Sequence, residues 1–282
     1  MTRTRRHGTA SAFARVFFML CAVVAACLPP AIGAAAADGR LRDFGVVYLH
    51  GKGAWAGAFN GGILSALRDE GALTATPEMP WSFHRRYAAT YDQAIAEIDA
   101  AIAGLKEKGA RRIVIIGHSL GANAAIGYAA RRPNLADLAG VVALSPGHLP
   151  EVGEMRGFVA GAVARAKKLV AEGKGGVVQT FPDMAQGIPL IAHATPTVYL
   201  SWFDPDGPAV IPKNAAAIGA SPHPLPLLWV VGKLDPIDRR GPSYAFDAAA
   251  KNPRSKYIEV FAGHLTTPLA ARAQVVAWIN SL

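Results

Sequence analysis

Cysteine is nearly absent from this chain of 282 residues, since Cys21 and Cys27 are the two present and both precede residue 38. If the segment before residue 38 is removed, no cysteine remains, which excludes a disulfide framework, a catalytic thiolate and a cysteine metal site. Long basic blocks are also missing: beyond residue 37 no run of Lys or Arg exceeds a pair such as Arg85-Arg86. The clustered basic patch typical of nucleic-acid binding is therefore not expected.

The N-terminal segment has no apolar run long enough to span a bilayer comfortably. Its continuous apolar stretch at 16–27 follows the arginine-rich, acid-free residues 1–15 and precedes small residues ending at Ala37. This order is typical of a secretory signal, so we expect a signal peptide at 1–37 and a periplasmic or secreted protein. A retained amphipathic anchor is one alternative. In another, residues 24–27 resemble a permissive bacterial lipobox, and Cys27 would carry a lipid anchor.

Apolar runs and helical periodicity alternate along the remaining chain. Apolar runs predict strands at residues 44–51, 111–117, 138–147, 226–232 and 255–263, and residues 75–81 are expected to form a short strand broken by two prolines. Helical spacing of apolar residues predicts helices at residues 61–72, 87–109, 121–133, 243–252 and 267–282. Strands that are apolar throughout favour a parallel sheet covered on both faces, so the predicted fold class is α/β.

This alternation stops between residues 148 and 223. A helical pattern there is followed by a stretch rich in proline and aromatic residues. Because an insertion this long in a compact domain is usually functional, we expect a cap at 148–223 on a core made of residues 38–147 and 224–282. The cap residues Tyr199 and Trp202 would suit an acyl or aromatic substrate, whereas the charges in "FDPDG" favour a polar one.

The stretch "IVIIGHSLGAN" places Ser119 between two glycines, after an expected strand and before an expected helix. In this G-x-S-x-G pattern, small neighbours let the backbone turn tightly and expose the hydroxyl. A serine is a poor nucleophile at its ordinary pKa, so it needs a base and a group that orients the base. Asp235 and His264 follow two later strands, which predicts that all three lie at the carboxyl edge of the sheet, where ligands bind.

With these motifs the chain resembles the α/β-hydrolase family over essentially the whole mature sequence apart from the cap. The order Ser119, Asp235, His264 is the family's order of nucleophile, acid and base. The resemblance implies that Ser119 is the nucleophile, His264 the general base and Asp235 the group that holds the imidazole. Asp238 is a competing acid, but the family's Gly-x-x-Asp-Pro pattern fits residues 232–236 and favours Asp235.

The resemblance also implies an oxyanion hole of backbone donors. One would be the N–H of Leu120, and the second would come from "HGKGAW" at 50–55, which resembles the family's His-Gly loop. This loop points to the N–H of Lys52, with Gly53 as the alternative. Many relatives have an apolar residue or glycine in place of Lys52, and we expect its ammonium group to face solvent rather than an anionic substrate. Trp55 is expected to wall the acyl pocket, although core packing is equally compatible.

Other histidines are assigned no catalytic role. His118, the variable residue of the motif, is expected to be structural, and His148, His193 and His223 are expected to face water rather than line a pocket. The family often begins with a β-hairpin, for which few residues precede the strand at 44–51. We therefore expect an α/β-hydrolase sheet of about six strands, all or nearly all parallel.

These expectations combine into an exported serine hydrolase that cleaves a carboxylic ester through an acyl-Ser119 intermediate, with no metal or organic cofactor. Its partner would be a small-molecule acyl substrate, with neither nucleic acid nor a stable membrane span. A thioesterase, lipase or amidase is open on the same scaffold, because a fold does not choose the chemistry. A non-catalytic ligand-binding homologue, and a cofactor-free haloperoxidase or lyase using the same triad, are the alternatives from other classes.

Overall fold

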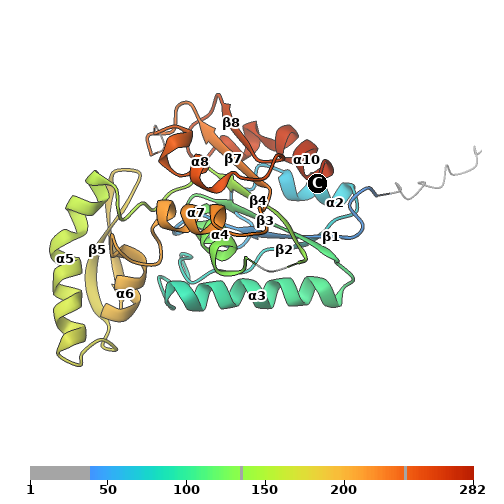
Figure 1. Cartoon of the computed structure of the whole chain (residues 1–282). Coiled ribbons are helices and arrows are strands. Elements are labelled where there is room, and N and C mark those ends of the chain that lie inside the picture. Colours follow the sequence, from blue (N-terminus) through green and yellow to red (C-terminus); the bar gives the residue numbers. More distant parts are fainter. Residues whose placement is uncertain (1–38, 134–135, 238–239) are drawn as a thin grey trace, which may run out of the picture. The chain divides into compact units, whose positions relative to one another are not determined.

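The computed structural model describes residues 39–133, 136–237 and 240–282. The expected signal peptide at 1–37 and the alternative lipid site Cys27 lie outside the described residues. The main-sheet strands are β1 (Phe44–Leu49), β2 (Leu73–Ala75), β3 (Arg112–His118), β4 (Leu138–Leu144), β7 (Leu227–Gly232) and β8 (Lys256–Val260). In this part of the chain they form one six-stranded sheet in the order β2-β1-β3-β4-β7-β8, parallel at every pairing (Figure 1). The predicted parallel α/β sheet is confirmed.

The strand predicted at 75–81 is wrong in its position. The structure pairs β2 with β1 only from Gly45↔Leu73 to Val47↔Ala75. Two prolines, Pro77 and Pro80, follow at once, and a proline has no N–H to donate to a ladder. The segment after β2 therefore runs out of the sheet and toward the loop that follows β1.

Helices cover both faces of the sheet, as the apolar strands predict. Against one face pack α3 (Tyr91–Glu107), α4 (Leu120–Arg131), α7 (Ile211–Gly219) and α8 (Phe246–Ala249), next to the short 3-10 helix η1 (Pro242–Tyr244). Against the other face pack α2 (Ile63–Asp69) and α10 (Arg272–Asn280), which follows α9 (Thr267–Ala270). Within the described residues, no helix has the length and apolar character needed to cross a membrane.

Helix α3 shows how local sequence sets a boundary. The predicted helix at 87–109 begins only after Thr90, whose side chain accepts the N–H of Gln93. The Gln93 side chain in turn accepts the N–H of Thr90 at 2.8 Å. This reciprocal capping box satisfies two N–H groups that the helix leaves free. The apolar face that follows, including Ile95 and Ile98, is buried against the sheet.

The segment between β4 and β7 contains α5 (Gly153–Ala171), β5 (Gln179–Ala185), β6 (Ile188–Ala194) and α6 (Pro196–Phe203), which lie together beyond one end of the sheet (Figure 1). The antiparallel β5–β6 hairpin was not predicted. Its turn is Gln186–Gly187, and both residues have positive φ, of 52° and 78°, as a two-residue type I′ turn requires. Helix α7 then returns to the sheet and packs beside α4.

Candidate functional site

Ser119 occupies a sharp turn between β3 and α4, with φ 58° and ψ −119°. The two glycines of the motif are needed for steric reasons. A Cβ at Gly117 would lie 2.1 Å from the carbonyl oxygen of Gly121, and a Cβ at Gly121 would lie 2.1 Å from that of Leu49. The predicted steric logic of G-x-S-x-G thus matches the contacts, and the turn presents the serine hydroxyl at the carboxyl end of the sheet.

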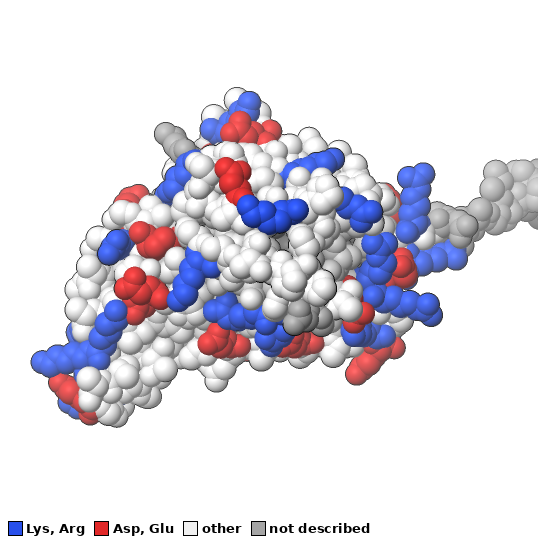
Figure 2. Space-filling view, in the orientation of Figure 1, with Lys and Arg blue, Asp and Glu red and all other residues white. Residues whose placement is uncertain are grey.

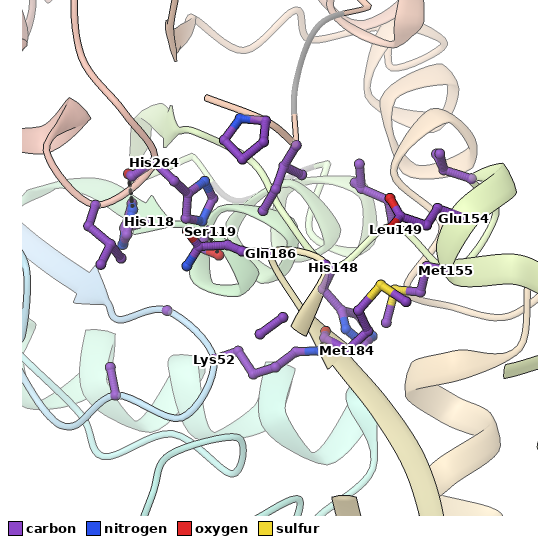
Figure 3. Close-up of a pocket in the computed structure, with 18 of the residues that line it drawn as sticks. Lys52, His118, Ser119, His148, Leu149, Glu154, Met155, Met184, Gln186 and His264 are labelled. Atoms are coloured by element: carbon purple, nitrogen blue, oxygen red, sulfur yellow. Dashed lines mark hydrogen bonds between the residues drawn. The ribbon is translucent and has the colours of Figure 1, made fainter. Parts of the chain in front are cut away.

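Ser119, His264 and Asp235 are joined in series by two hydrogen bonds. Figure 3 shows Ser119 and His264. The Nε2 of His264 lies 2.8 Å from Ser119 Oγ, and its Nδ1 lies 2.7 Å from Asp235 Oδ2. A carboxylate only accepts, so Nδ1 carries the proton, and in the neutral ring Nε2 is free to accept the serine proton. The structure therefore brings together the three residues predicted to form the triad. The competing Asp238 lies outside the described residues.

Asp235 is completely buried. Burial alone would raise the pKa of this carboxyl, but the hydrogen bond and charge of the His264 imidazole, together with the Ile237 N–H, outweigh it. The net pKa of Asp235 is lowered. The Ile237 N–H donates to Oδ1 at 2.9 Å, so each carboxylate oxygen has its own donor. Asp235 is thus an ionised acceptor with a fixed orientation.

The N–H groups predicted to form an oxyanion hole belong to Leu120 and Lys52. Leu120 is the first residue of α4, so its N–H has no acceptor within the helix, and the helix N-terminus favours negative charge. Over the described residues, neither N–H is bonded to another backbone carbonyl. A Cβ at Gly147 would lie 2.8 Å from Ser119 Oγ, and one at Gly51 would lie 3.2 Å from Ser119 Cβ. Glycine on both sides thus leaves room beside the hydroxyl.

The prediction that the Lys52 ammonium faces solvent is wrong. Its side chain is 9% exposed, and Nζ lies 2.5 Å from Asp183 Oδ1 and 2.8 Å from the carbonyl oxygen of Met184. Both acceptors come from β5, which the sequence analysis did not recognise as a strand. The lysine loses its solvation on burial, but it gains a carboxylate and a carbonyl in exchange.

A cavity of about 300 Å³ opens at Ser119, near the lower end of the range for small-molecule sites. In Figure 3, Ser119 and His264 lie on one side of it, and His148, Met155 and Met184 lie on the other. Its walls come from the loops after the main strands, from α5 and from the β5–β6 turn. The remaining lining residues are Gly51, Lys52, Ala54, Phe59, His118, Leu149, Val152, Glu154, Ala185, Gln186, Gly187, Pro236, Ile237, Arg240 and Leu265. The wall mixes apolar side chains with polar and charged ones, and its two methionines have flexible side chains that adapt to a ligand.

The structure does not bring Trp55, Tyr199 and Trp202, predicted to bind substrate, to the described cavity wall. Trp55 is 55% exposed, on the outer surface. Tyr199 is fully buried and stacks on the rings of Phe181 and Phe203. Trp202 is also fully buried and donates from Nε1 to the carbonyl of Ala89 at 2.9 Å. Helix α6 uses its aromatic residues as the core that supports the hairpin, a role that composition alone does not distinguish from a binding wall.

The prediction that His148 faces water is wrong. This residue is buried rather than facing water, and it lines the cavity. Its Nε2 donates to the carbonyl of Trp202 at 2.8 Å. Burial, and then the nearby Lys52 ammonium, hold the pKa of His148 well below its usual value, so the ring is neutral. His193 and His223 are exposed, as predicted.

Charge is mixed over the visible surface. On the face drawn in Figure 2, acidic and basic side chains of the described residues lie beside one another rather than in separate patches. The cavity itself includes both signs, with Lys52 and Arg240 against Glu154. On this face the charges therefore form no separate patch of one sign.

Several solved structures with the same fold are described as hydrolases. A monoacylglycerol lipase from Paleococcus ferrophilus is 23% identical, with a TM-score of 0.62 over 86% of this chain and 96% of that one. A siderophore hydrolase from Aspergillus fumigatus is 16% identical, with a TM-score of 0.62 over 86% and 91% of the two chains. A thermostable carboxyl esterase from Bacillus coagulans is 14% identical, with a TM-score of 0.57 over 86% and 89%. At these identities the likeness is one of fold.

The sequence also carries the family signature. Among curated proteins no sequence matches the chain significantly. Residues 46–278, however, match the profile of the alpha/beta hydrolase family, which spans the main sheet, the hairpin and the three hydrogen-bonded residues. The resemblance recognised from the motifs is confirmed, and the chain belongs to the alpha/beta hydrolase family.

Proposed function

We propose that this protein is an exported serine hydrolase that cleaves a carboxylic ester through an acyl-Ser119 intermediate. The observation that carries the proposal is the chain Ser119–His264–Asp235, with both hydrogen bonds at 2.8 Å or less. A binding protein has no need of a base and an orienting carboxylate aligned on one serine. These two hydrogen bonds therefore support a reactive serine hydroxyl rather than a pocket that only binds a ligand.

In the proposed reaction, His264 Nε2 takes the proton of Ser119 as Oγ forms a bond to the ester carbonyl carbon. The negative charge that develops on the carbonyl oxygen is stabilised by the N–H groups of Leu120 and Lys52. The bond between the carbonyl carbon and the alcohol oxygen then breaks, and His264 gives its proton to that leaving oxygen. Water, deprotonated by His264, attacks the acyl carbon; the bond from this carbon to Ser119 Oγ then breaks, His264 gives its proton to Oγ, and the acid is released. Asp235 stabilises the imidazolium at each stage.

The proposed reaction is tested with a fluorophosphonate probe, which labels activated serines. Wild type is expected to be labelled at Ser119, and labelling is expected to vanish in Ser119→Ala and His264→Ala. Ser65→Ala, an exposed serine of α2, is the matched control and should be labelled like wild type. A well-folded wild type that resists labelling would favour the ligand-binding alternative.

The substrate class is tested with a panel that pairs one acyl group with an alcohol, a thiol and an amine. We expect the ester to be cleaved faster than the amide, because alcohols leave more readily than amines, while the apolar part of the cavity wall accepts the acyl chain common to all three. The structural neighbours include a lipase and an esterase, which agrees with this choice. Because thiols leave more readily than alcohols, the thioesterase alternative would be selected if the thioester is cleaved and the matching ester is not.

Export is proposed from the sequence of residues 1–37 alone. Mass spectrometry of the protein recovered from the periplasm or medium tests it. A mature chain beginning at Asp38 agrees with cleavage after Ala37, whereas a chain beginning at lipid-modified Cys27 selects the lipoprotein route. A full-length chain confined to the cytoplasm contradicts both.

A further inference from the structure

The Lys52 ammonium group is fully engaged by the cap. It donates to Asp183 Oδ1 at 2.5 Å and to the Met184 carbonyl at 2.8 Å, and it lies 5.5 Å from the centre of the Phe203 ring. The exposed fractions of the Lys52 and Asp183 side chains are 9% and 4%. With a carboxylate, a carbonyl and an aromatic face around it, this cation is not placed to receive a substrate anion.

Both carboxylate oxygens of Asp183 accept hydrogen bonds in addition to the one from Lys52. Its Oδ1 accepts the N–H of Met184 at 2.6 Å, and its Oδ2 accepts the hydroxyl of Tyr87 at 3.2 Å. Tyr87 lies in the segment that leads into α3, so the carboxylate joins the hairpin to the core as well as to Lys52. The residues directly after Asp183, from Met184 to Gly187, line the cavity at Ser119.

The backbone on either side of Lys52 is hydrogen-bonded to the segment that follows β2, rather than to the β5–β6 hairpin. The Gly53 N–H donates to the Trp81 carbonyl at 2.9 Å, and Trp81 Nε1 donates to the His50 carbonyl at 2.8 Å. His50 Nε2 accepts the N–H of Met79 at 3.2 Å. These bonds hold the residues on both sides of Lys52 to the segment after β2. The Lys52 side chain adds a tie from the middle of the loop to the hairpin.

From this arrangement we infer that Lys52 and Asp183 are a positioning pair: their ion pair sets the backbone N–H of Lys52 for the oxyanion and holds the β5–β6 turn over Ser119. The inference rests on the proposed function. A buried ion pair contributes little net stability compared with apolar residues of similar volume, so a role in fixing geometry gives a reason for it. Displacing a catalytic group by about 1 Å costs about 100-fold in rate.

The test compares Lys52→Met, the double variant Lys52→Met/Asp183→Leu, and Lys167→Met. Methionine keeps the backbone N–H of residue 52 and removes only the ammonium group. The double variant leaves no unpaired buried charge, so it keeps the fold if the single variant does not. Lys167→Met is the control, because it removes an ion pair between the exposed Lys167 of α5 and the partly buried Asp204, which does not touch the oxyanion loop.

Two readouts are used: kcat per titrated active site, and hydrogen exchange of the amides at residues 50–55. In both Lys52 variants we expect kcat to fall by about 10- to 100-fold and the loop amides to exchange faster, while Lys167→Met matches wild type. A double variant with wild-type kcat would overturn the inference, and so would unchanged exchange of the loop in a folded variant. If wild type shows no turnover, the proposed function fails, and the exchange experiment still decides whether the pair holds the loop.

Discussion

His118 donates a hydrogen bond from Nε2 to the main-chain carbonyl of His264 at 2.9 Å. A carbonyl only accepts, so the proton of the His118 ring is on Nε2. The two rings lie 5.2 Å apart (Figure 3). The residue before the proposed nucleophile thus fixes the backbone that carries the proposed base. The structural role predicted for His118 is therefore to hold the main chain at His264.

Replacing His118 tests that role. We expect His118→Leu, which has no donor, to lower kcat by about 10- to 100-fold with a small change in KM, because the His264 ring loses its alignment with Ser119. His118→Gln can present an amide N–H near the position of Nε2 and should recover much of the rate. The measurement is steady-state kinetics normalised to titrated active sites. Equal rates in the glutamine and leucine variants would contradict a role for this hydrogen bond.

Stability should fall in mild acid. Burial, and then the neighbouring His264, lower the pKa of His118 from 6.5 to about 4. Below about pH 6.5 the unfolded chain binds a proton that the folded chain does not, so the stabilisation is complete above that pH and is lost as the pH falls through 4. The shift corresponds to about 3 kcal/mol. His148, with a pKa lowered in the same direction, adds to the trend.

Urea unfolding at about pH 7 and about pH 4.5 measures this loss. The free energy of unfolding of wild type should decrease more between the two conditions than that of His118→Gln, which has no ring to protonate. The same pH dependence in both proteins would show that His118 does not contribute.

Asp235→Asn should reduce kcat by about 10⁴-fold, as the equivalent change does in serine proteases. The amide can still accept the Ile237 N–H, but its NH2 group faces His264 Nδ1 and favours the tautomer that cannot accept the serine proton. The measurement is the rate constant for phosphonylation of Ser119. Asp247→Asn, an exposed residue of α8, is the control and should react like wild type.

Two glycine substitutions should distinguish an effect on access to the Ser119 hydroxyl from an effect on the stability of the fold. In Gly147→Ala the new methyl group would lie 2.8 Å from Ser119 Oγ, a side-chain atom that can rotate away from His264. We expect kcat/KM to fall by about 100-fold and the melting temperature to change little. In Gly121→Ala the methyl group would meet the Leu49 carbonyl at 2.1 Å, and backbone cannot move aside so easily. We expect that variant to lose several kcal/mol of stability.

Calorimetry and fluorophosphonate labelling distinguish the two glycine effects. Gly147→Ala should melt like wild type and label slowly, whereas Gly121→Ala should melt early or fail to accumulate. Rapid labelling of Gly147→Ala would mean that the hydroxyl does not need the space beside Gly147.

Sequence reasoning was sufficient for the parts of the protein that local patterns determine. Apolar runs predicted the parallel sheet, and turn sterics predicted the conformation at Ser119. Chain order placed Asp235 and His264 at the same sheet edge, where they meet the serine. Each of these features depends on residues that are close in sequence or on the regular geometry of a parallel sheet.

The elements between β4 and β7 were predicted poorly because their geometry depends on contacts between distant segments. The Lys52–Asp183 pair joins residues 131 positions apart, and no periodicity links them. The hairpin has a proline in each strand, which hides its alternation, and the turn Gln186–Gly187 carries its clearest signal. Aromatic residues such as Tyr199 and Trp202 occur both in protein cores and in the walls of binding sites, so composition could not predict that these two are buried in the core.

The tip of the β5–β6 hairpin lines the cavity without being part of the main sheet. Gln186 and Gly187 line the cavity, yet they belong to a two-residue turn that contributes no strand to the main sheet. Mutations or short insertions at this turn can reshape the wall opposite the serine without altering the register of any parallel strand. The hairpin tip is therefore a place where the cavity wall can change at little cost to the main sheet.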